Sequence, residues 1–151
     1  MKLGRNRPYE AAGRPRVLVP FLGELDPMVL DAAIRIARAE EAVLVPAYLL
    51  LLPMELGPES PATREVEVAM PVLEAVEQAA LREGVPVDAR IERGRTPTHT
   101  LKRLWEVERF DRIVVPAGAR SGFTAKDLAW ILTHAPSETV ILKPQPGPQP
   151  P

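Results

Sequence analysis

The densest group of polar side chains lies in the run Arg-Gly-Arg-Thr-Pro-Thr-His-Thr at residues 93–100. It brings two arginines, three hydroxyl groups and a histidine close to a predicted helix start at Thr96 and Pro97. Free amides and the helix dipole attract anions at such a start, so this run is a candidate site for a small anionic ligand. The competing interpretation, that Thr96 or Thr98 only caps the helix, is favoured by the pattern. The candidate contacts are Arg95, Thr96, Thr98 and His99.

A second candidate contact for a phosphate or carboxylate is the pair Arg120 and Ser121. The pair lies between Gly118 and Gly122, in a loop that leads into a predicted helix near Ala125. Here too the helix start would attract an anion. The simpler interpretation, a solvated arginine beside a helix cap, is the one we favour.

His99 and His134 are the two histidines of the chain, and neither is placed for catalysis. As a general base, His99 would need a nucleophile and an orienting carboxylate, which the sequence does not place beside it. His134 fits the last turn of a predicted helix, where the dipole favours a cation. The chain has no cysteine, which excludes thiolate nucleophiles, disulfides and sulfur-ligated zinc. Because nucleophile-elbow, P-loop and dinucleotide motifs are missing too, the sequence favours a metal-free binding protein over an enzyme.

The charge balance gives no reason to expect a polyanionic partner. Nineteen basic and twenty acidic residues leave a net charge of -1, so nucleic-acid binding is not predicted and would need a local patch. Residues 1–15 are predicted to form a flexible basic arm, which is explained more simply as solubilising than as an RNA contact. Residues 144–151 are predicted to form a disordered, proline-rich tail.

The chain is predicted to be a cytoplasmic protein. Its first residues carry positive charges without the apolar segment that a secretory signal needs. The most apolar stretch, residues 42–56, is broken by Pro46 and Pro53 and is shorter than the roughly 20 residues of a membrane helix. Eighteen prolines and the absence of cysteine also fit a heat-adapted protein.

Hydrophobic patterns predict the elements that must position these side chains. Asp26 before Pro27 indicates a helix start, and Gly84 indicates a helix end. Pro46 removes a ladder donor, which predicts a bulge or a place near the sheet edge, and Pro71 predicts a helix bend. Strands are predicted at residues 16–22, 42–51, 85–92, 111–115 and 138–143. Helices are predicted at 27–41, 63–83 and 97–107 and from residue 124 to 134, the third with Leu101, Leu104, Trp105 and Val107 on its apolar face.

Strands and helices alternate along this single domain, residues 16–143. Such alternation predicts an α/β fold, a Rossmann-like three-layer sandwich in which four helices cover both faces of a five-stranded parallel sheet. Ligands in these folds bind beyond the carboxyl ends of the strands, where the strand order reverses. We expect this switch point after Leu22 and after Val115.

Four segments, in order, resemble the universal stress protein family. Residues 17–24, Val-Leu-Val-Pro-Phe-Leu-Gly-Glu, are similar to its opening strand, and residues 110–115, Phe-Asp-Arg-Ile-Val-Val, to its fourth strand. Gly94 and Pro97 match a recurring point before a helix. Residues 131–143, with His-Ala-Pro before an apolar strand, are similar to the family's closing segment. The resemblance runs from residue 16 to residue 143.

The resemblance implies the strand order 3-2-1-4-5, frequent dimerisation through the last strand and, in many members, ATP binding at the switch point. A homodimer would bury the apolar edge that Val140, Ile141 and Leu142 present in a terminal strand. By the same resemblance, the candidate ligand-binding residues are Pro20, Leu22, Tyr48, Gly94, Gly118, Arg120, Ser121 and Gly122.

The sequence departs from the family where ATP would bind. Leu22 replaces the family's aspartate, and Pro116 and Ala119 replace the first two glycines of its phosphate loop. Pro116 has no amide to offer, and a Cβ at Ala119 narrows the approach of a phosphate. The sequence therefore predicts a non-enzymatic stress-response or regulatory module that binds neither ATP nor magnesium. The alternative is an adenine-nucleotide sensor or weak ATPase whose loop is restored by Gly118 and Gly122; an enzyme of the wider nucleotide-hydrolase-like superfamily would need catalytic groups that are not found.

Overall fold

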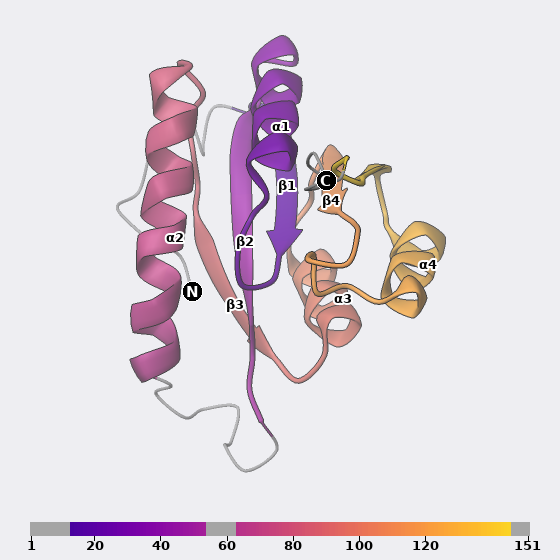
Figure 1. The fold of residues 1–151 in the computed structure, drawn as a ribbon. Coiled ribbons are helices and arrows are strands. Elements are labelled where there is room, and N and C mark those ends of the chain that lie inside the picture. Colours follow the sequence, from indigo (N-terminus) through magenta and orange to yellow (C-terminus); the bar gives the residue numbers. More distant parts are fainter. Residues whose placement is uncertain (1–12, 54–62, 146–151) are drawn as a thin grey trace, which may run out of the picture.

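The computed structural model describes residues 13–53 and 63–145 (Figure 1). Strands and helices alternate as predicted from the sequence. The strands are β1 (Arg16–Phe21), β2 (Val43–Leu51), β3 (Arg90–Gly94), β4 (Arg112–Pro116) and β5 (Glu138–Leu142). The helices are α1 (Pro27–Ala39), α2 (Thr63–Arg82), α3 (Pro97–Val107) and α4 (Ala125–His134). The basic arm and the tail predicted for residues 1–15 and 144–151 lie mostly outside the described residues.

All five strands are parallel and form one sheet in the order β3-β2-β1-β4-β5, which confirms the predicted order. Successive residues of a strand face opposite sides of a sheet, so β1 feeds two cores. Val17 and Phe21 pack with residues of α1 and α2, whereas Leu18 packs with residues of α3 and α4. Figure 1 shows the two helix pairs on opposite sides of the sheet, which gives the predicted three layers.

The helix starts follow their predicted caps. The carboxylate of Asp26 accepts a hydrogen bond from the Met28 amide at 2.8 Å, and Pro27 is the first helical residue of α1. At α4, Thr124 and Asp127 form a reciprocal capping box, as their spacing predicts. These bonds satisfy amides that have no partner within the helix, and they fix where each helix leaves the sheet edge.

Pro46 does not cause the predicted bulge. It pairs in register with Val19 of β1, and β2 lies one strand inside the edge of the sheet. The amide of Leu44 donates to Pro86 and its carbonyl accepts from Asp88, in the segment before β3, so the nitrogen of Pro46, two residues on, faces the β3 side as well. The pairing of β2 with β3 lapses there, between an isolated bridge at Leu44 and the ladder that begins at Ala47. The gap, rather than a bulge, absorbs the missing donor, and β2 lies next to the edge strand, in line with the other predicted possibility.

Two further predictions on local structure are corrected. The third strand begins at Arg90 instead of residue 85, because residues 85–89 touch β2 only through the isolated bridge at Val87. Val107, predicted on the apolar face of α3, is 77% exposed in its last turn. Pro71 lies inside α2, which runs to Arg82, and the bend predicted there stays a prediction. The helix ends before Gly84, which has a φ of 75°, as predicted. Across residues 13–53 and 63–145, no helix is both long enough and apolar enough to span a bilayer.

Candidate functional site

The strand order reverses beside β1, which lies between β2 and β4. The carboxyl ends of β1 and β4 therefore form the switch point at which α/β sheets bind ligands, as predicted from the sequence. Leu22 follows β1 here, and the loop from Ala117 to Thr124 follows β4.

Leu22 and Gly122 are brought together at this switch point. Gly122 has a φ of 83°, and a Cβ placed on it would stand 3.0 Å from Cδ1 of Leu22. Leu22 is half-buried and packs in the same apolar cluster as Phe123, which is buried. Two of the predicted ligand-binding residues are thus neighbours, but their contact is apolar and leaves little room between them.

Hydrogen bonds within the loop use Ser121 internally. Its hydroxyl donates to the carbonyl of Gly118 at 2.8 Å and accepts from the amide of Phe123 at 3.1 Å. The amide of Ser121 donates to the same carbonyl at 3.1 Å, and the residue is only 8% exposed. Two loop amides and the hydroxyl are therefore already paired. Arg120, by contrast, is exposed on the outside of the loop.

The start of α4 carries its own negative charge. Asp127 accepts the amide of Thr124 at 2.8 Å, and Thr124 Oγ1 accepts the amide of Asp127 at 3.0 Å. A carboxylate at a helix start is stabilised by the dipole and repels a second anion there. The capping interpretation of this helix start is confirmed, and the helix dipole is already compensated.

Pro116 and Ala119, which replace the first two glycines of the family's phosphate loop, lie where β4 ends beside β5. Pro116 is the buried last residue of β4 and pairs in register with Leu142, while Ala119 is exposed. A Cβ on Gly118 would stand 3.7 Å from the side chain of Lys143 and 3.9 Å from that of Pro144. The loop after β4 therefore packs against the end of β5.

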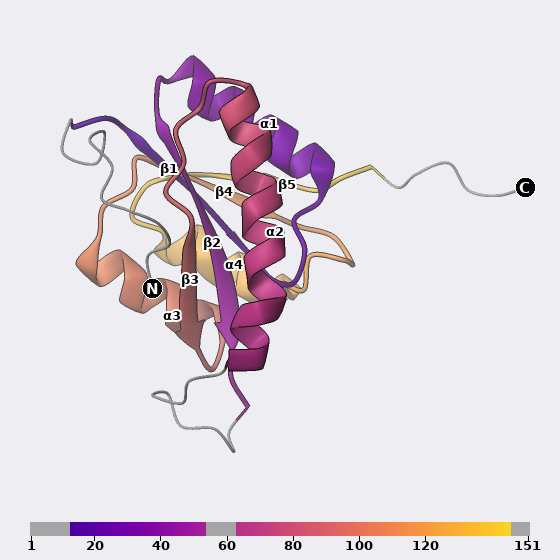
Figure 2. The same cartoon turned by 90° about the vertical axis from the view of Figure 1, so that its left-hand side faces the viewer.

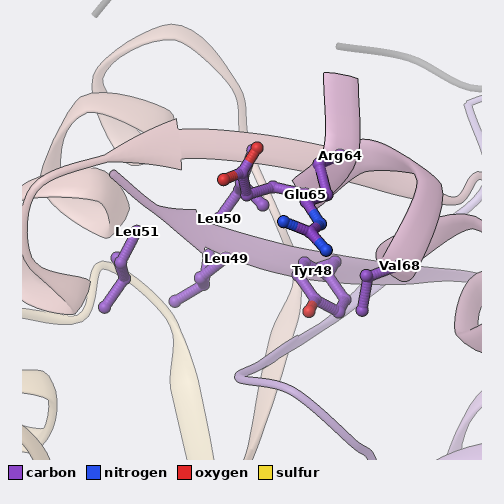
Figure 3. A pocket seen from close by; sticks show the side chains of 7 residues that line it. All are labelled: Tyr48, Leu49, Leu50, Leu51, Arg64, Glu65 and Val68. Carbon is purple, nitrogen blue, oxygen red and sulfur yellow. The ribbon is translucent and has the colours of Figure 1, made fainter. Parts of the chain in front are cut away.

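A shallow pocket of about 320 Å³ opens beside the carboxyl end of β2 (Figure 3). Arg64 and Glu65 project over it from the first turn of α2, and the strand contributes Tyr48 among others. Tyr48 is 8% exposed and makes an edge-to-face contact with Phe21, with ring centroids 5.5 Å apart. It is the one residue of the predicted ligand-binding set that lines this pocket; Pro20, also in that set, is buried within β1.

In the polar run at residues 93–100, Thr96 and Arg95 make internal contacts. Thr96 is the cap of α3 and accepts the amide of His99 at 3.1 Å. The guanidinium of Arg95 donates to the backbone carbonyls of Leu52 and Pro53. Gly94 is required because a Cβ there would stand 1.9 Å from the Oγ1 of Thr100. The capping interpretation is confirmed for Thr96, and an anion at this run stays a prediction.

Sequence reasoning missed a buried ion network at the amino ends of the strands, opposite the switch point. Arg90 is 2% exposed and binds Asp88, which is 3% exposed, and Glu108, each at 2.8 Å. Arg16 joins both carboxylates at 3.2 Å. The alternation of Asp88, Arg90 and Glu92 on one face of an extended segment was the available signal.

This network shifts the pKa values of its members. Burial by itself would raise the pKa of Glu108, but the hydrogen bond from Arg90 and the charges of Arg90 and Arg16 lower it below its ordinary value. Burial lowers the pKa of Arg90, and the bonds to Glu108 and Asp88 more than reverse this. For Glu92 burial dominates and raises the pKa. Among the described residues, no group of three or more His, Cys, Asp and Glu side chains is placed to hold a metal ion.

Comparison with known proteins decides what this architecture is. No family model matches the sequence, and no curated protein matches it. Solved structures do match. A universal stress protein family member from Burkholderia pseudomallei aligns with a TM-score of 0.61 and 20% identity, over 83% of this chain and 94% of that one.

A universal stress protein from Archaeoglobus fulgidus gives a TM-score of 0.67 at 14% identity, over 88% of this chain and 96% of that chain. The chain has the fold of the universal stress proteins. An Arabidopsis thaliana protein with this fold was solved with AMP bound and aligns at a TM-score of 0.64 and 18% identity, over 87% of this chain and 92% of its own. Others with the universal stress protein fold were solved in complex with cAMP and with dAMP.

Proposed function

We propose that this chain is a non-enzymatic binding module of the universal stress protein type, acting in the cytoplasm in a stress response, with a nucleotide site that no longer takes ATP. The ordered sequence resemblance over residues 16–143 and the fold support the family. The loss of the glycines of the phosphate loop supports the proposal that the site no longer takes ATP.

The contact between Leu22 and Gly122 carries this proposal. A triphosphate at the switch point needs backbone amides that it can approach closely. Leu22 instead lies against Gly122, and the amides of Ser121 and Phe123 are bonded within the loop. Asp127 adds a negative charge at the adjoining helix start. Each of these features opposes a triphosphate more strongly than a ligand with one phosphate.

The alternative function is a sensor for an adenine nucleotide with one phosphate. It is favoured by the AMP, cAMP and dAMP complexes of proteins with the same fold. On this chain Arg120 would supply the positive charge, because it is exposed beside the switch point. The pocket beside Tyr48 would then receive the base or the ribose.

Isothermal titration calorimetry with ATP and magnesium, with AMP and with cAMP separates the two functions. We expect no heat of binding for ATP. Micromolar ATP binding would contradict the proposal, and binding of AMP or cAMP alone would establish the alternative. In that case Arg120→Ala would abolish binding, whereas Lys126→Ala, an exposed cation in the first turn of α4, would leave it unchanged.

We also propose a homodimer formed through β5. This strand ends the sheet, and its outer edge has no strand partner within the described part of the chain. Val140, Ile141 and Leu142 are each only partly buried there. An open apolar edge of this kind is normally covered in a folded protein, and antiparallel pairing with a second β5 would cover it.

A further inference from the structure

Two tryptophans from different helices meet on the face of the sheet that α3 and α4 cover. The rings of Trp105 and Trp130 are nearly parallel, at 6°, with centroids 5.8 Å apart. The ring of His134, one turn after Trp130, stacks on it at 4.5 Å and 16°. These rings lie in a groove of about 330 Å³, which we call the tryptophan groove and which is lined by Lys102, Trp105, Glu106, Trp130, His134 and Pro136.

The composition of the groove fits a neutral, partly apolar ligand. Aromatic residues make up 5% of the chain, yet both of its tryptophans lie here, and both are only partly buried. The indole N–H of Trp105 is covered and has no acceptor among residues 13–53 and 63–145. Lys102 and Glu106 place one charge of each sign at the rim, so neither cations nor anions are selected.

The chain itself contains a segment of the matching chemistry. Residues 144–151 read Pro-Gln-Pro-Gly-Pro-Gln-Pro-Pro, with five prolines in eight positions and no side-chain charge. Proline-rich segments favour the extended polyproline II conformation and lose little entropy when they bind. They dock in aromatic-lined grooves, where proline rings lie against indole rings. Their unpaired carbonyls can also accept a tryptophan N–H.

The direction of β5 decides whether the groove is nearer to the tail of its own chain or to the tail of a second copy. Trp130 and His134 lie in the second half of α4, just before the turn at Pro136 into β5. β5 then carries the chain away toward the opposite sheet edge, and Figure 2 shows the described end of the chain pointing away from α3. To reach its own groove, the tail would have to reverse and travel back along all of β5, roughly 16 Å.

A second copy needs no reversal. In the homodimer proposed above, antiparallel pairing of the two β5 strands places the carboxyl end of one beside the amino end of the other. Pro144 of one copy then emerges beside Glu138 of its partner, two residues from Pro136 at the groove. A two-fold axis makes the contact mutual, so that each copy gives one tail and receives one.

We propose that the tryptophan groove binds residues 144–151 of a second copy of this chain, in an exchange of tails that rests on the proposed β5 dimer. The exchange would link the dimer at three places, the paired strands and the two grooves. Because these contacts form together, loss of the tails weakens the dimer without removing its central interface.

Tryptophan fluorescence, excited at a wavelength that tyrosine does not absorb, reports the groove alone, because the chain has no tryptophan elsewhere. The test uses the full chain and a tail variant with Pro146→Ser, Pro148→Ser, Pro150→Ser and Pro151→Ser. The double variant Gln145→Ala and Gln149→Ala is the matched control, since it changes the tail and keeps every proline. Emission is recorded over a dilution series, and light scattering on the same samples gives the oligomeric state.

We expect the emission of the unchanged chain and the control to shift to longer wavelength as the dimer dissociates on dilution. The tail variant should emit at the longer wavelength at every concentration, and its dimer should dissociate at about tenfold higher concentration. A dimer whose emission is the same with and without the tail prolines would overturn the tail contact and leave the dimer standing. A chain that is monomeric throughout would overturn both, and neither result bears on ATP binding.

Mixing two defective variants separates exchange from docking within one copy. The tail variant keeps an intact groove, and Trp130→Leu keeps an intact tail. If tails are exchanged, a mixed dimer contains one complete groove and tail pair, so mixing restores the short-wavelength emission of Trp130. The control is Leu132→Ala, a substitution on the exposed side of α4, used in place of Trp130→Leu. This variant keeps both the groove and the tail, so it should bind tails before any mixing. No recovery on mixing, with a clear effect of the tail prolines, would show that each groove binds its own tail and would overturn the exchange.

Discussion

Leu22 and Gly122 show how closely one side chain can approach the backbone at the switch point. Gly122 tolerates its φ of 83° because it lacks a Cβ, and the same lack makes room for Leu22. Gly23 offers a comparison within the same site, since its φ is 67° and a Cβ there would meet nothing within 4 Å. Both glycines have a positive φ, but only a Cβ on Gly122 would meet a neighbouring side chain.

Gly122→Ala should therefore destabilise the protein more than Gly23→Ala. Each substitution costs about 1–2 kcal/mol for an alanine in the left-handed region. Gly122→Ala adds the cost of displacing Leu22, and Leu22→Ala should remove that added part. Urea unfolding of the two single variants and of the double variant measures the coupling between positions 22 and 122. Equal losses for the two glycine variants would show that Leu22 does not crowd the loop.

Glu108 supplies the second prediction at the scale of single residues. Its pKa is lowered in the folded protein, so its contribution to stability is present above the ordinary value of 4.5 and is lost as the pH falls through the lower folded value. Glu108→Gln should cost about 2–3 kcal/mol at pH 7, less than for a fully buried pair because the side chain of Glu108 is 22% exposed. The difference between the two proteins should shrink below pH 5 and vanish in acid.

Denaturant unfolding between pH 3 and pH 7 measures this change. Glu83→Gln is the matched control, because Glu83 pairs with Arg38 at the surface, where the side chains are 53% and 68% exposed. Such a pair contributes about 0–1 kcal/mol, so the control should follow the unchanged protein closely. A Glu108→Gln loss that is as large at pH 3 as at pH 7 would mean that packing, not charge, holds this residue.

Among the elements, α4 depends most visibly on its capping residues. It has ten residues and a single fully buried side chain, Ile131, so packing alone holds it weakly. Thr124→Ala removes the Oγ1 that accepts the Asp127 amide and should cost about 1 kcal/mol. Thr124→Ser keeps the oxygen and should stay within a few tenths of a kcal/mol of the unchanged protein. Faster amide hydrogen exchange in the first turn of α4, seen only for the alanine variant, checks the assignment.

The sequence predicted these elements well where the signal is local. Asp26 with Pro27 and Thr124 with Asp127 fix helix starts through contacts between residues that are close in the chain. The bulge predicted at Pro46 is absent, because the cost of the missing amide depends on which neighbour that amide would face. The start of β3 was misplaced for the same reason, since pairing with β2 is a property of two strands.

The sequence predicted where the switch point lies but not which contacts its residues make. Alternation of strands and helices placed the switch point after Leu22 and Val115, because the topology follows general rules. The sequence could not show that Leu22 rests on Gly122, or that Ser121 turns inward to Gly118. The stack of Trp105 on Trp130 joins residues of different helices, and no local pattern indicates such a contact. The network around Arg90 also joins different elements, and its only local signal is the alternation of charges in the segment before and within β3.

At the scale of the whole molecule, the open edge of β5 is where the proposed dimer would form. Val140→Arg places a charge in the middle of β5, at a partly buried residue outside both core clusters, and should convert the proposed dimer to a monomer, because a like charge from the second copy would face it. Val107→Lys is the matched control, since Val107 is a 77% exposed valine of α3 away from β5. Light scattering at tens of micromolar checks both, and a monomeric unchanged protein would contradict the dimer.

The ion network around Arg90 and the loop at Gly122 lie at opposite ends of the strands. Arg16, at the first residue of β1, belongs to the network, and Leu22, just past the last, belongs to the loop. That separation is about 20 Å along an extended strand, and substitutions so far apart add independently in free energy. Residues of the loop at Gly122 can therefore change during evolution while the ion network around Arg90 continues to stabilise the fold. A lineage can lose one ligand, or acquire another, without first losing the ability to fold.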